Sequence, residues 1–142
     1  MAMQKARRSA RELALNVLYQ IDAAGLSSEE ALHTALDQSK LDDNSRRFVE
    51  RLVQGALENL AKIDEELREL SPDWPPDRQP IVDRNILRMA VNEINNSDDV
   101  PEVVSVNEAV ELAKKFSTAE SGRFINGVLA AYLRRLSKTD GG

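Results

Sequence analysis

The segment KARRSARELALNVLYQIDAA, residues 5–24, carries the pattern that decides the fold. Its apolar residues recur at the three- and four-residue spacing of one face of an α-helix. Gly25 follows directly, and glycine commonly ends helices. The segment therefore predicts an amphipathic helix with one buried face. The apolar positions are Ala10, Leu13, Ala14, Val17, Leu18 and Ile21.

The helical periodicity continues after this segment. Ser27 and Glu30 have the spacing of a capping box, which predicts a short second helix. Asp42, Asp43 and Asn44 are residue types that favour the N-cap, the position just before a helix, so they predict the start of a third helix. The apolar stripe that follows reaches residue 70 and predicts one long helix, bent near Gly55 or Asn59.

The stretch SPDWPPD, residues 71–77, interrupts the helical pattern, because prolines remove backbone donors and restrict the preceding residue. Beyond it, Pro80 suits the start of another helix. Ser105 and Glu108 predict a second capping box, and a last helix is expected over residues 121–136. No segment alternates as a β-strand does. We predict an all-α protein of about seven helices, with residues 1–142 forming one domain and two helical sub-bundles, 1–70 and 78–137, sharing one core.

Composition excludes several classes of protein. The 142 residues are 42% hydrophobic and 30% charged, which is typical of a soluble globular domain, and no run approaches membrane-spanning length. The absence of cysteine excludes disulfides and thiolate metal sites. We predict a cytoplasmic protein.

Catalytic motifs are missing from the sequence. His33 is the single histidine, and no nucleophile and acid can be paired with it from the sequence. The glycine-rich phosphate loops and the HExxH zinc motif do not occur. We therefore predict that the protein is not an enzyme and has no catalytic residue, no metal and no cofactor.

Charge is distributed unevenly along the chain. The net charge is −5, but the first 20 residues hold four bases and one acid, whereas residues 26–70 hold eleven acids and six bases. Positive charge at a helix N-terminus opposes the helix dipole, so such a cluster has a folding cost. A solvated helix start and a phosphate-binding site are about equally compatible with this pattern. The cluster consists of Lys5, Arg7, Arg8 and Arg11.

Three further residues each allow two interpretations. Tyr19 lies at the edge of the apolar face and either stacks on a base or packs at the core edge, of which packing is favoured. Gly127 is unfavourable within a helix, so it indicates a close helix crossing or a ligand at the backbone, and close packing is favoured. Asn126 is open to a role in RNA binding or in a polar network.

Three blocks of sequence, spread over nearly the whole chain, form a specific pattern. The first is ARRSARELA at 6–14, leading to Leu18 and Tyr19. The second is DRNILRMA at 83–90, with Glu93 and then DVP at 99–101. The most specific is VNEAVELAKKF at 106–116, followed by RFINGVL at 123–129. Together these blocks resemble the NusB transcription-antitermination family, and the resemblance covers nearly the whole chain.

The resemblance implies a function and two functional faces. It implies a bacterial antitermination factor that binds boxA-type single-stranded RNA together with the ribosomal protein NusE and supports ribosomal RNA transcription. Other Nus factors and RNA polymerase would be indirect partners, and a homodimer is an alternative state. The implied RNA-facing residues are Lys5, Arg7, Arg8 and Arg11, with Tyr19, Glu120, Arg123, Phe124 and Asn126 around the last helix. The implied NusE-facing residues are Asp83, Arg84 and Glu93.

The chain departs from the family pattern at three positions. Glu102 and Val103 stand where some members carry an aromatic and then a basic residue, which weakens that part of the RNA footprint. Asn92 stands where an aromatic is common. Two other functions stay open: an RNA-independent helical scaffold, and a NusB-like domain separated from a ribosomal RNA methyltransferase.

Overall fold

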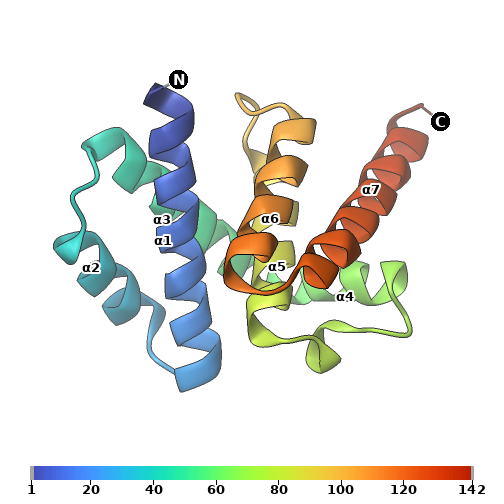
Figure 1. Cartoon of the computed structure of the whole chain (residues 1–142), viewed down its shortest axis with the longest axis horizontal. Helices are drawn as coiled ribbons and strands as arrows, with labels where there is room; N and C mark the ends of the chain where they lie inside the picture. The colour runs from blue at the N-terminus through green and yellow to red at the C-terminus, as the bar shows by residue number, and fades with distance from the viewer. Residues whose placement is uncertain (1, 142) are drawn as a thin grey trace. The chain divides into compact units, whose positions relative to one another are not determined.

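The computed structural model describes residues 2–141, and across that range it contains seven α-helices, one short 3-10 helix and no strand (Figure 1). This confirms the all-α prediction. By backbone contacts the chain divides into two compact units, Met1–Glu58 and Asn59–Gly142. Among the described residues, no helix is both long and apolar enough to cross a membrane.

Unit 1 contains α1 (Ala2–Ala24), α2 (Ser28–Gln38) and α3 (Asp43–Glu58). α1 packs along α3, and α2 contacts both. The predicted apolar face of α1 is buried at Ala10, Ala14 and Leu18. Gly25 ends α1 as predicted, with a φ of 68°, a left-handed conformation that glycine adopts without steric cost.

Side-chain caps begin α2 and α3 where the sequence predicts them. The Ser27 hydroxyl accepts a hydrogen bond from the Glu30 amide at 3.1 Å. The Asp42 carboxylate accepts one from the Ser45 amide at 2.8 Å. This backbone bond holds the pKa of Asp42 below its usual value, since it favours the charged carboxylate.

The long helix predicted up to residue 70 is interrupted at Asn59, one of the two expected bend positions. Asn59 has φ −108° and ψ 16°, and α4 (Leu60–Leu70) starts immediately after it. α4 contacts α5 and α7 and clusters with unit 2. The division between the units therefore lies at residue 58, earlier than the predicted sub-bundle boundary at 70, because the apolar side chains Ile63 and Leu67 pack into unit 2 rather than continuing the stripe of α3.

Unit 2 continues with η1 (Pro76–Arg78), α5 (Ile81–Asn96), α6 (Glu102–Phe116) and α7 (Ala119–Gly141). Pro80 and Pro101 stand immediately before α5 and α6. α6 and α7 are joined by a short turn and pack along each other. The largest buried side chains of the unit include Ile86, Leu87, Ile125, Leu129 and Tyr132.

The second predicted capping box is wrong. α6 already begins at Glu102, so Ser105 lies inside the helix and is buried. Its hydroxyl donates a hydrogen bond of 2.7 Å to the buried carboxylate of Glu93 on α5. Ser105 therefore takes part in a contact between α5 and α6 rather than in a helix start.

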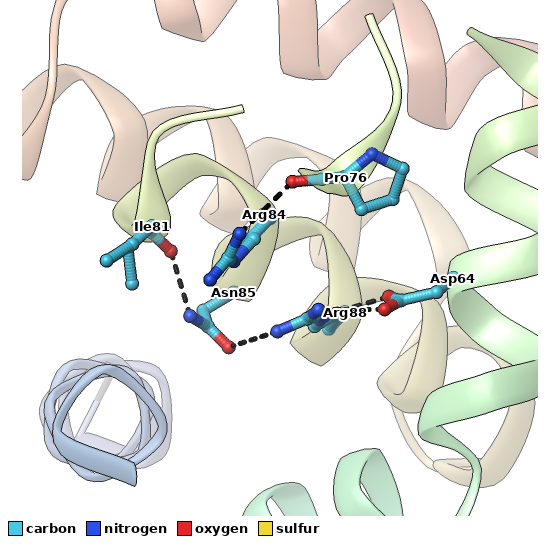
Figure 2. A network of polar contacts seen from close by, with 6 residues as sticks. All are labelled: Asp64, Pro76, Ile81, Arg84, Asn85 and Arg88. Atoms are coloured by element: carbon cyan, nitrogen blue, oxygen red, sulfur yellow. Dashed lines mark hydrogen bonds and ion pairs between the residues drawn. The ribbon is translucent and has the colours of Figure 1, made fainter. Parts of the chain in front are cut away.

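A polar network fastens α5 to its neighbours within unit 2 (Figure 2). The Arg88 guanidinium donates two hydrogen bonds of 2.8 Å to the two carboxylate oxygens of Asp64 on α4. Arg88 also donates to the Asn85 side chain at 3.3 Å, and Asn85 donates to the Ile81 carbonyl at 2.8 Å. Arg84 reaches the carbonyl of Pro76 in η1 at 3.4 Å.

Candidate nucleic-acid interface

The exposed side of α1 carries a line of polar and charged residues. Lys5 and Arg8 are exposed one turn apart, and Asn16 and Tyr19 are exposed further along the helix. Tyr19 is 40% exposed. It therefore packs only in part at the core edge, the favoured prediction, and the rest of the residue is accessible. Two cations and an accessible aromatic on one helix form a surface suited to phosphate and to an unstacked base.

The other two predicted cations of α1 turn toward α3. The Arg7 guanidinium carbon lies 4.6 Å from the centroid of the Phe48 ring, and that of Arg11 lies 5.3 Å from it. Arg7 is half-buried, and Arg11 is 3% exposed. The prediction that Arg11 faces RNA is therefore corrected, because its position against the buried aromatic ring withdraws it from the surface. Lys5, Arg7 and Arg8 stay as predicted contacts.

The predicted residues near the start of α7 are accessible to different degrees. Glu120, Arg123 and Asn126 are exposed, and Phe124 is partly buried. Glu120 and Phe124 line a hollow of about 220 Å³ in unit 2. The remaining lining residues are Trp74, Pro80, Asp83, Thr118 and Ser121.

Trp74 is the residue of this hollow that the sequence analysis missed. It is the single tryptophan of the chain, lies in the proline-rich stretch and is 47% exposed. The available signal in the sequence is a lone tryptophan within a stretch that predicts no helix, whereas the sequence analysis treats the stretch only as a boundary between helices. The structure places Trp74 beside predicted residues from two other segments, Asp83 and Phe124.

Two of the three predicted protein-partner residues lie in the interior. Asp83 is buried, and the Ser121 hydroxyl donates to one of its carboxylate oxygens at 2.8 Å. Glu93 is buried and accepts the bond from Ser105. Only Arg84 reaches partly to solvent. The prediction that Asp83 and Glu93 lie on a partner-facing surface is therefore corrected, since both carboxylates are buried and join helices.

The three departures from the family pattern have different surroundings. Glu102 and Val103 are exposed in the first turn of α6. Asn92 is buried, and its side-chain oxygen accepts a hydrogen bond of 2.8 Å from Asn96. The substitution at 92 therefore lies in the interior, whereas those at 102 and 103 change the surface.

Gly127 is not in a close helix crossing, contrary to the favoured prediction. It is exposed within α7, and a Cβ added there would meet no heavy atom within 4 Å. A glycine in an exposed helix interior lowers stability without a packing gain. Of the two predicted explanations, approach of a ligand to the backbone is the one that remains.

Replacing Gly127→Ala is expected to raise the free energy of unfolding by about 1 kcal/mol, because the helix gains propensity at an uncrowded position. Urea denaturation followed by circular dichroism measures the change. Gly122→Ala serves as the comparison, since its added Cβ would lie 3.2 Å from the Lys114 side chain. An equal or smaller gain at Gly127 than at Gly122 would contradict this assignment.

The described part of the chain was also compared with the requirements of a metal site. Within it, no group of three or more His, Cys, Asp or Glu side chains could hold a metal ion. His33 is exposed on α2.

Comparison with known proteins identifies the family. The sequence model of the NusB family matches residues 8–134. The transcription antitermination protein NusB of Symbiobacterium thermophilum is 44% identical over 95% of this chain and 94% of its own length. NusB from T. maritima has a similar structure, with a TM-score of 0.82, 33% identity and 88% of each chain covered.

A second similar solved structure is a complex of several molecules. It contains the antitermination factors NusB and NusE with dsRNA, and one of its chains matches with a TM-score of 0.81, 27% identity and coverage of 89% of this chain and 95% of that one. Fold, helix order and sequence thus agree over nearly the full length, and the chain belongs to the NusB family.

Proposed function

We propose that this protein is a transcription antitermination factor that binds boxA-type single-stranded RNA together with NusE and supports ribosomal RNA transcription. The observation that carries the proposal is the pair of exposed cations Lys5 and Arg8 on α1, with Tyr19 accessible on the same helix. Membership of the NusB family and the solved complex of its relative with NusE and RNA support it. We infer that it acts in the cytoplasm, by binding and not by catalysis.

RNA binding would use two kinds of contact. The cations of α1 fix backbone phosphates, since charge-assisted bonds to phosphate are stronger than neutral ones. Tyr19, Phe124 and Trp74 offer aromatic surfaces for unpaired bases. The remaining exposed candidates, Arg123 and Asn126, would contribute polar contacts from α7.

NusE binding would use the part of α5 that includes Arg84. The Asp83 and Glu93 carboxylates would act from beneath the surface by holding α7 and α6 against α5. Loss of either carboxylate would then weaken NusE binding through altered helix positions. This division of roles follows from burial, because a buried carboxylate cannot meet a partner without local opening.

The testing experiment is a titration of a labelled boxA oligonucleotide with the protein, with and without NusE, at several salt concentrations. Three phosphate contacts, from Lys5, Arg7 and Arg8, predict that log K falls with log salt with a slope of about −2 or steeper for a single strand. We expect NusE to tighten RNA binding. A scaffold without RNA contact would give no binding and no salt slope, which would overturn the proposal.

A further inference from the structure

The aromatic ring of Phe48 is surrounded by three guanidinium groups. Phe48 lies on α3 and is 2% exposed. The guanidinium carbons of Arg7, Arg11 and Arg51 lie 4.6, 5.3 and 5.6 Å from the ring centroid. All three distances are within the range of roughly 6 Å over which a cation is attracted to the face of an aromatic ring.

Three cations around one ring form a dense cluster, since significant cation–π contacts occur about once per 70–80 residues. Arg7 and Arg11 are four residues apart on α1, a spacing at which like charges repel each other. The Phe48 ring offsets part of this repulsion and keeps the positive charges together.

The three arginines differ in their access to solvent. Arg11 is buried, Arg7 is half-buried and Arg51 is exposed. Arg51 lies three residues after Phe48 on α3, in the segment whose net charge is negative, so counting charges along the sequence did not reveal it. The ring thus brings an exposed cation from α3 next to one from α1.

We propose that Phe48 is a positioning residue of the RNA-binding surface, whose ring holds the Arg7 and Arg51 guanidinium groups in place for backbone phosphate, so that α3 contributes Arg51 to the surface formed by α1. The inference rests on the proposed RNA-binding function. An arginine side chain loses rotamer freedom when it binds phosphate, and stacking on a fixed ring removes part of that loss beforehand.

Replacing Phe48→Leu tests the role of the ring. Leucine keeps an apolar side chain in the core but has no π face, so we expect boxA RNA binding about tenfold weaker. The matched control is Leu36→Ala, a core change on α2 in the same unit. Both are measured well below their thermal midpoints. If both variants lose the same affinity, the effect is general destabilisation and the proposal is overturned.

A fluorinated phenylalanine at position 48 provides the second measurement, and it decides the outcome if Phe48→Leu does not fold. Fluorination weakens the negative face of the ring while nearly preserving its volume. We expect RNA affinity, measured on fully folded protein well below each thermal midpoint, to fall progressively with each added fluorine. Affinity independent of fluorination would overturn the positioning role.

Replacing Arg51→Gln tests the contribution of α3. Loss of one phosphate contact is expected to make the salt slope shallower by about 0.7 for a single strand. Arg47→Gln is the control, since Arg47 is exposed on the same helix and its loss changes the net charge equally. Equal slopes for the two variants would overturn the assignment of Arg51.

If the unaltered protein binds no RNA, the proposed function itself fails. If the protein binds RNA and the variants bind it equally well, only the inference about Phe48 and Arg51 fails.

Discussion

The double variant Lys5→Glu/Arg8→Glu is expected to bind a boxA oligonucleotide at least a hundredfold more weakly than the unaltered protein. Both side chains are exposed on α1. A hydrogen bond to a charged group contributes about 1.5 kcal/mol or more, so loss of two, with added repulsion of phosphate, exceeds two orders of magnitude. The salt slope should become shallower by about 1.4, the share of two phosphate contacts on a single strand. Fluorescence anisotropy at fixed salt measures the change.

The choice of Lys5 and Arg8 over Arg7 and Arg11 separates binding from folding. Arg7 and Arg11 lie on the Phe48 ring, so their reversal would disturb the packing of α1 on α3. The matched control is Lys62→Glu/Arg68→Glu on α4, which changes the net charge equally at two other exposed positions. The proposed function assigns no phosphate contact to these two residues, so the control should bind nearly normally. Equal losses in both double variants would show that only net charge matters.

Replacing Arg88→Ala is expected to lower the free energy of unfolding by about 2–3 kcal/mol. The two hydrogen bonds to Asp64 are short and parallel, and the side chains are only 11% and 21% exposed (Figure 2). The expected loss lies between about 0–1 kcal/mol for surface pairs and about 3–5 kcal/mol for buried pairs that lose one partner. Loss of Arg88 would also leave the Asn85 oxygen without one of its donors. Urea denaturation should show a lower midpoint with an unchanged slope.

Two comparisons sharpen this prediction. Arg88→Lys keeps the charge but cannot form the two-pronged contact with Asp64, so we expect a loss of intermediate size. Arg135→Ala removes the more exposed ion pair with Glu69, whose side chains are 37% and 56% exposed, and should cost less than about 1 kcal/mol. A cost for Arg88→Ala no larger than for Arg135→Ala would mean that the network of Figure 2 does not stabilise unit 2.

Features set by neighbouring residues were predictable from the sequence. The amphipathic face of α1, its end at Gly25 and the caps at Ser27 and Asp42 depend on residues within one or two turns of each other. The family resemblance, carried by blocks spread over the chain, was confirmed by the comparisons. The basic character of the first helical segment was also evident from the sequence.

Features set by contacts between helices could not be predicted. Helical spacing places Arg11 in the basic cluster, but only the packing of α1 on Phe48 of α3 shows that Arg11 is buried. Ser105 has the spacing of a cap, yet its hydroxyl bonds to Glu93 on another helix. A local pattern cannot distinguish these outcomes, because the partner in each case is far away in the sequence.

The chain's own order of residues determined which segments are helical, where most of them start and end, and that the first of them is basic, because short-range hydrogen bonding and periodicity govern these properties. Tertiary structure alone decided which charged side chains remain at the surface, since burial depends on the helices that pack against them. It also brought Trp74 together with Asp83 and Phe124 around one hollow, a proximity between distant segments that no local pattern encodes.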